Sequence, residues 1–168
     1  MTTGAAVRLV SLDIVLYAVF QTIRIGTDRL LPAGWINPDS WYFRTKAWER
    51  GGRFYEDHFH INRWKDRLPA VDGFNAVSKK RLGGVSADYL QQFVVETCRG
   101  ESHHVRTIVE TAVFALWNPP SIFWAVFVIG GLSQLPFIMV QRYNRPRLEE
   151  LLAEVARSKR ASSVRVSA

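Results

Sequence analysis

The feature that most constrains this chain is the stretch between Glu110 and Arg142, which contains no charged side chain. About 20 apolar residues are enough to cross the hydrocarbon core of a bilayer as a helix. The segment from Ile122 to Val140 meets that length, and an uncharged run this long disfavours the alternative of a buried helix in a soluble protein. Aromatic side chains flank the segment, as they do at membrane interfaces: Trp117, Trp124 and Tyr143. The sequence therefore predicts a membrane helix over residues 120–140.

A second apolar segment runs from Leu9 to Ile23 and predicts another membrane helix, over about residues 8–25. It is interrupted by Asp13, and a carboxylate in a lipid-facing helix costs about 2.5–3.5 kcal/mol. We therefore expect Asp13 to face protein or to lie near the interface. A cleaved signal peptide is the alternative, but no convincing small-residue cleavage site follows the segment, so we expect a retained helix.

The region between the two apolar blocks, residues 26–104, is polar and rich in aromatic residues. The whole chain carries 22 Lys and Arg against 15 Asp and Glu, a net charge of +7. Such a balance is typical of proteins that bind nucleic acid, an anionic membrane surface or a phosphorylated ligand. The aromatic residues beside these charges predict either a surface in the lipid headgroup region or a small aromatic core: Trp41, Tyr42, Phe43, Trp48, Phe54, Tyr55, Phe59 and Trp64.

Three further helices are expected. Ser86 predicts an N-capped helix start, followed by apolar residues at helical spacing. Residues 105–117 form a segment too short to span the membrane, which Pro119 and Pro120 should end, so it is predicted to be re-entrant or interfacial. In the basic tail, residues 141–168, Asn144 and Pro146 predict the start of a last helix. The fold expected for residues 1–168 is therefore one mainly α membrane domain with two membrane helices and one re-entrant or interfacial helix.

The distribution of Lys and Arg predicts the topology. The basic tail should lie in the cytoplasm by the positive-inside rule, and the polar region prefers the same side. Both can be inside only if the block from Val105 to Val140 enters and leaves the membrane on one side. A plain two-pass arrangement would instead place the polar region outside.

Three clusters of residues are candidates for chemistry. The acids and histidines from Glu56 to His60 could bind a metal or face solvent, and no metal site is expected. His104 lies at the entrance to the apolar block, three residues after Glu101 and eight after Glu96, a pattern that suits a general base oriented by a carboxylate. It also fits an exposed helix end. Arg142, Arg145 and Arg147 directly follow the membrane helix and could hold a phosphate, a diphosphate or a lipid headgroup, or act only as topology signals.

The chain resembles a known family at these residues. The segment Val140-Gln-Arg-Tyr-Asn-Arg-Pro-Arg-Leu148 matches the glycosyl-4,4'-diaponeurosporenoate acyltransferase family almost letter for letter. Looser matches are the block from Gly52 through Trp64 and Lys65, with Asp72-Gly73 beyond it, and Glu96, Thr97, Arg99, Glu101 and His104 in order and spacing. His58, His60 and His103 lie outside the matching pattern.

This resemblance implies esterification of a fatty acyl group onto a sugar hydroxyl of a glycosylated carotenoid acid, in staphyloxanthin-type synthesis. It implies a bacterial cell-membrane enzyme with membrane lipids, a glycolipid acceptor and an acyl donor as partners, and with neither a bound cofactor nor nucleic acid. The donor would be acyl-CoA, its diphosphate held by the arginines. Catalytic roles are expected for His104, Glu101 and Glu96. Substrate binding is expected from Trp64, Lys65, Arg99, Arg142, Tyr143, Asn144, Arg145 and Arg147. The alternatives are another membrane glycolipid or isoprenoid as acceptor, or a lipid-binding subunit without catalysis.

Overall fold

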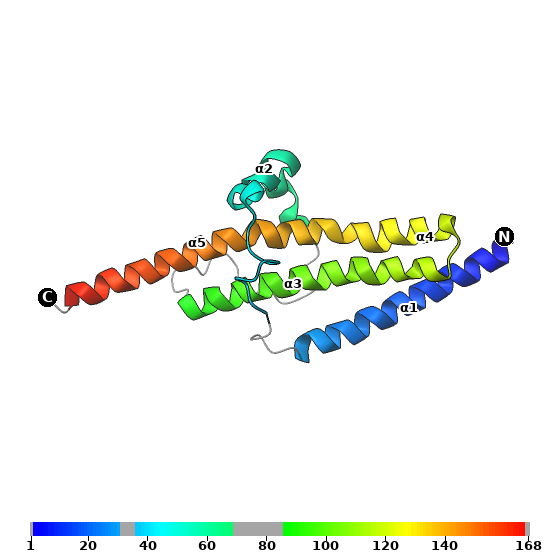
Figure 1. The fold of residues 1–168 in the computed structure, drawn as a ribbon, viewed down its shortest axis with the longest axis horizontal. Helices are drawn as coiled ribbons and strands as arrows, with labels where there is room; N and C mark the ends of the chain where they lie inside the picture. Colours follow the sequence, from blue (N-terminus) through cyan, green and yellow to red (C-terminus); the bar gives the residue numbers. More distant parts are fainter. Residues whose placement is uncertain (1, 31–35, 69–85, 167–168) are drawn as a thin grey trace. The chain divides into compact units, whose positions relative to one another are not determined.

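The computed structural model describes residues 2–30, 36–68 and 86–166, and the described residues are mainly helical and contain no strand (Figure 1). The mainly α fold class is therefore confirmed. The helices are α1 (Thr3–Leu30), α2 (Arg53–Phe59), α3 (Ala87–Val113), α4 (Pro120–Val126) and α5 (Leu135–Val166). Shorter helical turns lie between them: Ala47–Gly52, Ile61–Arg63, Lys65–Arg67, Phe114–Leu116, Phe127–Gly131 and Leu132–Gln134.

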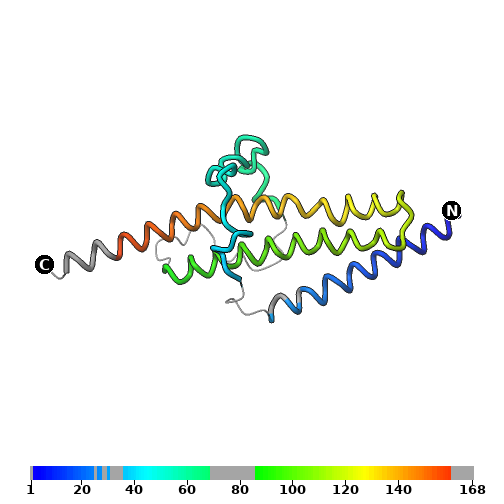
Figure 2. The backbone as a smooth tube through the Cα atoms, in the orientation of Figure 1, coloured from blue at the N-terminus to red at the C-terminus, as the bar shows by residue number. Residues whose placement is uncertain are grey.

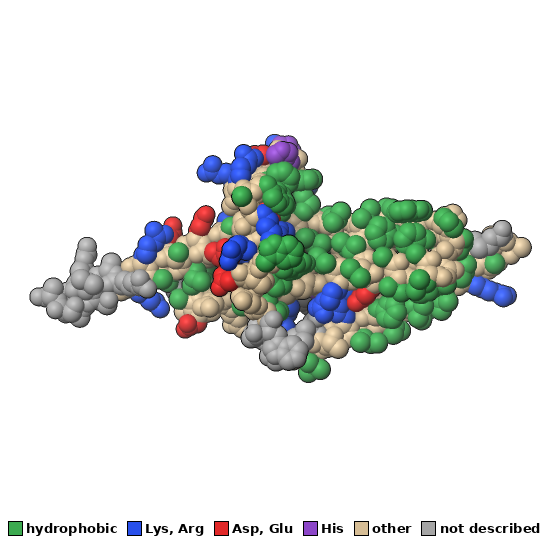
Figure 3. All heavy atoms as spheres, in the orientation of Figure 1, with side chains coloured by type: hydrophobic (Ala, Val, Ile, Leu, Met, Phe, Trp, Pro, Cys, Tyr) green, Lys and Arg blue, Asp and Glu red, His purple; other side chains and the backbone are tan. Residues whose placement is uncertain are grey.

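Two helical segments are long and apolar enough to cross a membrane: Thr3–Arg24, and part of the helical run Pro120–Lys159. Only 6% and 11% of their most apolar windows are buried inside the structure. The core helix of a soluble protein would be mostly buried. Instead, hydrophobic side chains cover the surface of α4 and of the N-terminal part of α1 (Figure 3). The prediction of two membrane helices is confirmed.

The chain divides into two compact units, which we describe separately. Unit 1 comprises Met1–Ile36 and Arg99–Ile138, and unit 2 comprises Asn37–Cys98 and Met139–Ala168. Helices α3 and α5 contribute residues to both. The prediction of a single domain over residues 1–168 stays a prediction.

Unit 1 is built around a helical hairpin made by the end of α3 and the α4–α5 segment (Figure 2). The turn lies between Val113 and Pro120, so the break expected at Pro119-Pro120 is confirmed. Beyond it the chain runs back along α3, because the side chain of Gln134 contacts that of His104. The helix entering the hairpin does not begin at residue 105, as predicted, because α3 is continuous from Ala87. A single glycine such as Gly100 weakens a helix without breaking it.

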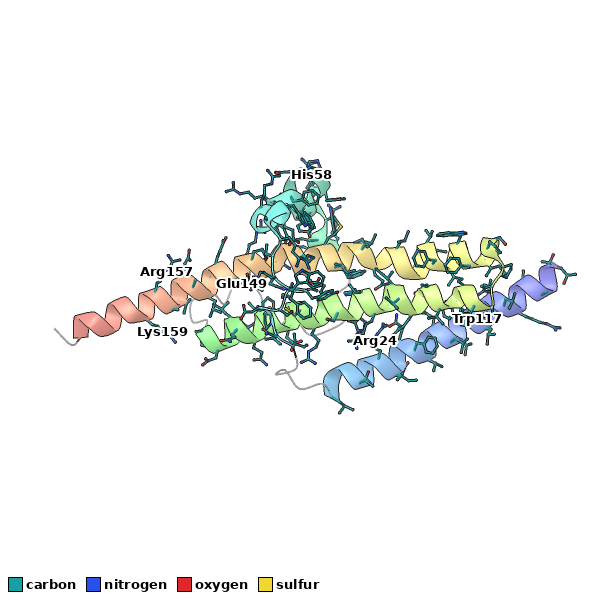
Figure 4. All side chains as sticks on the ribbon, in the orientation of Figure 1. Arg24, His58, Trp117, Glu149, Arg157 and Lys159 are labelled. Atoms are coloured by element: carbon teal, nitrogen blue, oxygen red, sulfur yellow. The ribbon has the colours of Figure 1, made fainter. Side chains whose placement is uncertain are left out.

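Helix α1 completes unit 1 and lies antiparallel to α3. Near its N-terminal end, Asp13 is 2% exposed. Its Oδ1 accepts a hydrogen bond from Trp117 Nε1 at 2.9 Å, and its Oδ2 accepts one from Asn118 Nδ2 at 2.8 Å (Trp117 is labelled in Figure 4). Further along, Arg24 donates to Glu110 Oε2 at 2.7 Å. The expectation that Asp13 faces protein is confirmed.

Unit 2 contains the first part of α3, which starts as predicted. The hydroxyl of Ser86 accepts a hydrogen bond from the Tyr89 amide at 3.2 Å, the geometry of an N-cap. Of the apolar stripe expected there, Phe93 is half-buried and the other residues are buried: Leu90, Val94, Thr97 and Cys98. Helix α5 does not start at Asn144 as predicted, because it runs unbroken from Leu135 through Pro146. Proline disfavours a helix interior without forbidding it where packing holds the helix.

The structure confirms an aromatic core for part of the aromatic stretch, and a headgroup-facing surface for the other rings stays a prediction. Tyr55 is 4% exposed and forms a small core with Ile61 and Tyr143, against which Phe54 and Trp64 pack. Other rings face outward, with Trp41 80% and Trp48 55% exposed. The stretch therefore supplies an internal core and an apolar outer surface.

Gly52 occupies a position that only glycine tolerates. Its φ is +91°, and a Cβ there would collide with Arg147 Nη1 and lie 3.1 Å from the Tyr143 carbonyl oxygen. We expect Gly52→Ala to lower the free energy of unfolding by about 1–3 kcal/mol, measured by thermal unfolding in detergent. Gly26→Ala in α1 is the matched control, since a Cβ there meets nothing within 4 Å and alanine favours a helix. Equal melting temperatures for the two variants would contradict this role for Gly52.

Candidate functional site

His104 lies in unit 1, on the face of α3 that meets the returning helical segment of the hairpin. Its Nδ1 and Gln134 Oε1 are 2.8 Å apart. The ring stacks on Phe137, with centroids 4.8 Å apart and an interplanar angle of 17°. The imidazole is half-buried and is held on its edge by an amide and on its face by an aromatic ring.

The hydrogen bonds of Gln134 favour one tautomer of His104. The Gln134 amide nitrogen donates to the Gly130 carbonyl oxygen at 3.1 Å, which turns Oε1 toward the imidazole. Since Oε1 can only accept, Nδ1 is the donor, and the lone pair of the neutral ring lies on Nε2. A histidine in this form can take a proton at Nε2 from a hydroxyl within reach.

The two glutamates expected to assist His104 occupy different positions. Glu101 lies in the same unit, one turn before His104 on the same face of α3, and its side chain is 2% exposed. Glu96 belongs to unit 2. Eight residues of α3 separate it from His104 in the chain, a rise of about 12 Å along the helix axis, and its catalytic role stays a prediction. Gln134 is the residue that the structure places at His104 Nδ1.

The expected arginines lie in unit 2, where each has internal partners. Arg142 donates from Nε to Glu49 Oε1 at 2.6 Å and from Nη2 to Oε2 at 2.9 Å, a bidentate pair. Glu49 is fully buried and also accepts a hydrogen bond from Tyr55 Oη at 2.6 Å. Arg145 is 1% exposed and donates to Thr97 Oγ1 and to the Phe43 carbonyl oxygen.

The Glu49 network makes stability depend on pH. Burial acts to raise the pKa of Glu49, but hydrogen bonds from Arg142, the Lys46 amide and Tyr55 outweigh it and hold the pKa below its ordinary 4.5. A carboxyl with a lowered folded-state pKa contributes stability above its unfolded value and loses it as the pH falls through the folded value. We therefore expect the melting temperature in detergent to fall between pH 5 and pH 3, by less in Glu49→Gln than in the wild type. An identical fall in melting temperature in both proteins would show that Glu49 does not cause the loss of stability at low pH.

A second polar cluster surrounds Glu56. Its Oε1 accepts hydrogen bonds from Tyr143 Oη at 2.8 Å, Asn62 Nδ2 at 3.0 Å and Arg147 Nη2 at 2.7 Å. The bonds from Tyr143 and Asn62, and then the charge of Arg147, hold the pKa of Glu56 below its ordinary range. The guanidinium of Arg147 also lies 3.6 Å from the centroid of the Tyr143 ring. The Arg147 side chain is 35% exposed, so this cluster faces outward.

The remaining expected binding residues are divided between the units. In unit 2, Trp64 packs against the core and donates from Nε1 to the Phe59 carbonyl oxygen, while Lys65 pairs with Asp66 at 2.6 Å. Asn144 is half-buried on α5. Arg99 begins the α3 portion of unit 1. Asp72 and Gly73 lie outside the described residues. Binding roles for all these residues stay predictions.

Sequence reasoning missed two residues that organise these clusters, Gln134 and Glu49, and it considered Glu56 only as a possible metal ligand or solvent-facing acid. Gln134 carried a usable signal, because a polar amide inside an uncharged apolar run is costly unless it has a partner. Glu49 carried none, since acids are common in a charged, aromatic segment. Among the described residues, no group of three His, Cys, Asp or Glu side chains is placed to hold a metal ion.

Comparison with known proteins agrees with the motifs. The family model of glycosyl-4,4'-diaponeurosporenoate acyltransferase matches residues 38–154. A Staphylococcus haemolyticus protein of that name is 28% identical over 148 residues, covering 84% of this chain and 85% of its own. Proteins of that name from Staphylococcus aureus strains RF122 and USA300 are each 29% identical over 114 residues, covering 66% of this chain and 67% of their own. No solved structure matches the chain.

Proposed function

Because the chain belongs to the glycosyl-4,4'-diaponeurosporenoate acyltransferase family, we propose that it transfers a fatty acyl group to a sugar hydroxyl of a glycosylated carotenoid acid. That it is an acyltransferase follows from the family. The proposal adds that the transferred group is a fatty acyl group and that its acceptor is a sugar hydroxyl. The observation that carries it is the family match over residues 38–154, which contains His104 and the Arg142–Arg147 motif.

His104 is the proposed general base. Its Nε2 takes the proton of the sugar hydroxyl as the hydroxyl oxygen attacks the acyl carbonyl carbon. The new C–O ester bond forms, the C–S bond of a thioester donor breaks, and the proton passes from Nε2 to the leaving sulfur. Gln134 keeps Nδ1 protonated and Phe137 holds the ring plane, so no rotation of the imidazole is needed during the reaction.

The proposed acyl donor is acyl-CoA, with its diphosphate bound by arginine. Among the three expected arginines, Arg147 is the best candidate, because its guanidinium is the most exposed. Arg145 is buried, and Arg142 already neutralises Glu49. The aromatic side chains that face outward, Trp41 and Trp48, would lie among lipids.

The protein is membrane-associated through its two apolar helices. We propose the bacterial cell membrane, with the basic tail in the cytoplasm. The hairpin supports this topology, since the chain returns along α3 after its turn. The polar region and the tail can then share one side, as their Lys and Arg content prefers.

The decisive test is mass spectrometry of lipid extracts from a bacterial host that makes the glycosylated carotenoid acid, with and without this gene. The expected result is a new species heavier by one fatty acyl group. An unmodified glycoside, with the protein present in the membrane fraction, would overturn the carotenoid acceptor. Acylation of another glycolipid in the same extract would identify the acceptor instead.

A further inference from the structure

Unit 1 contains a pocket between α1 and α3 that the acyl-transfer chemistry does not use. Its volume is about 280 Å³, and it is lined by Phe20, Ile23, Arg24, Thr27, Arg106, Glu110 and Val113. On α3, Arg106 lies two residues after His104, which places it about 200° around the helix. The pocket therefore opens on the opposite face of α3 from the imidazole.

The lining of the pocket changes from charged to apolar along the helix axes. Thr27 and Arg106 lie at one end, and Phe20 and Val113 lie at the other: Phe20 is seven residues before Thr27 on α1, and Val113 is seven residues after Arg106 on α3. Seven residues of helix span about 10 Å. Because α1 and α3 are antiparallel, both helices place their polar residue at the same end. That gradient matches an amphiphile with a polar headgroup and apolar chains.

The net positive charge of the pocket favours an anionic ligand. Two arginines and one glutamate line it, so its net charge is positive. Arg24 is anchored to Glu110 at 2.7 Å and is 4% exposed, on the side of α1 that faces α3 (Figure 4). Arginine in a low-dielectric site binds phosphate by charge-assisted hydrogen bonds. Arg24 is thus fixed in place before a ligand arrives.

The apolar end of the pocket opens toward the bilayer. Ile23 is 59% exposed on α1, one of the two apolar membrane helices, and Val113 is 42% exposed at the end of α3. A volume of about 280 Å³ holds a headgroup and the first carbons of its chains, while the rest of the chains stay in the membrane. We propose that this pocket binds an anionic phospholipid, with its phosphate at Arg24 and Arg106 and its chains beside Phe20 and Val113.

The test is lipid binding by the full chain in detergent, followed by native mass spectrometry with phosphatidylglycerol and phosphatidylcholine. The wild type should prefer phosphatidylglycerol. Arg106→Gln should weaken its binding about tenfold, the value of one charge-assisted hydrogen bond. Arg63→Gln is the matched control, because it removes one charge from an exposed turn in unit 2. Equal binding of the two lipids, or equal losses in the two variants, would overturn the proposal.

Two further variants keep the test decisive if Arg106→Gln fails to fold. Glu110→Gln removes the negative charge from the pocket, while its amide oxygen can still accept a hydrogen bond from Arg24, so phosphatidylglycerol should bind more tightly. Val113→Trp fills the apolar end and should weaken binding of the same lipid. Weaker binding in Glu110→Gln, or unchanged binding in Val113→Trp, would count against the site. Preference for a free fatty acid over phosphatidylglycerol would overturn the assignment of a phospholipid.

Discussion

His104→Ala should reduce acyl transfer by about 10²–10⁴-fold, the usual contribution of a general base. The protein should still accumulate in the membrane fraction, because the His104 ring is only half-buried and alanine favours a helix. The measurement is the yield of acylated product per amount of protein, by mass spectrometry of lipid extracts. Product formed at the wild-type rate would remove His104 from the mechanism.

Two variants separate catalysis from packing at this position. His103→Ala removes the neighbouring imidazole, whose centroid lies 5.3 Å from that of His104, and should leave the rate nearly unchanged. Gln134→Ala removes the acceptor of the Nδ1 proton and should lower the rate by less than His104→Ala does. It should also shift the pH profile of the reaction, since the tautomer is no longer fixed. A pH profile identical to that of the wild type would show that Gln134 contributes only to packing.

Arg142→Ala should lower the free energy of unfolding by about 3–5 kcal/mol, because it leaves the buried carboxylate of Glu49 without its bidentate partner. A loss of that size is a large part of the stability of a small domain. We therefore expect little folded protein at 37 °C. Arg147→Ala is the matched control: its partner Glu56 is 34% exposed, so the expected loss is roughly 1 kcal/mol or less.

The double variant Glu49→Gln with Arg142→Ala distinguishes a structural arginine from a donor-binding one. Neutralising Glu49 removes the unpaired charge, so folding should largely return. If Arg142 also binds the acyl donor, the refolded double variant should have a raised KM for that donor. A normal KM in the double variant would assign Arg142 to structure alone.

The elements that the sequence predicted correctly rest on strong local signals. The uncharged run from Ile122 to Val140, the break at Pro119-Pro120 and the cap at Ser86 each act through their own neighbours in the chain. The incorrect boundaries had weaker signals. Pro146 was read as the start of a helix, but α5 continues through it. The buried contacts of Tyr143 and Arg145, which directly precede Pro146, hold that part of the helix.

The candidate site was predicted less completely, because its organisation depends on contacts distant in sequence. His104 was found from its position beside the apolar block. Its partner Gln134 lies thirty residues further on and meets it only through the hairpin. Likewise, the arginines after the membrane helix were found as a motif, but their pairing with Glu49 and Glu56 requires that α5 lie against the segment containing α2. Spacing along one element cannot reveal such pairs.

The hydrogen bonds of Asp13 have a consequence for biogenesis. During synthesis α1 leaves the ribosome long before Trp117 and Asn118, the residues that satisfy its carboxylate. Until the hairpin arrives, Asp13 in the bilayer carries a penalty of about 2.5–3.5 kcal/mol. We therefore expect α1 to be less stably inserted until the hairpin is complete, when Trp117 and Asn118 hydrogen-bond to Asp13. A chain truncated before the hairpin turn would present an unsatisfied intramembrane acid, a mark by which quality-control proteases can recognise an unfinished protein.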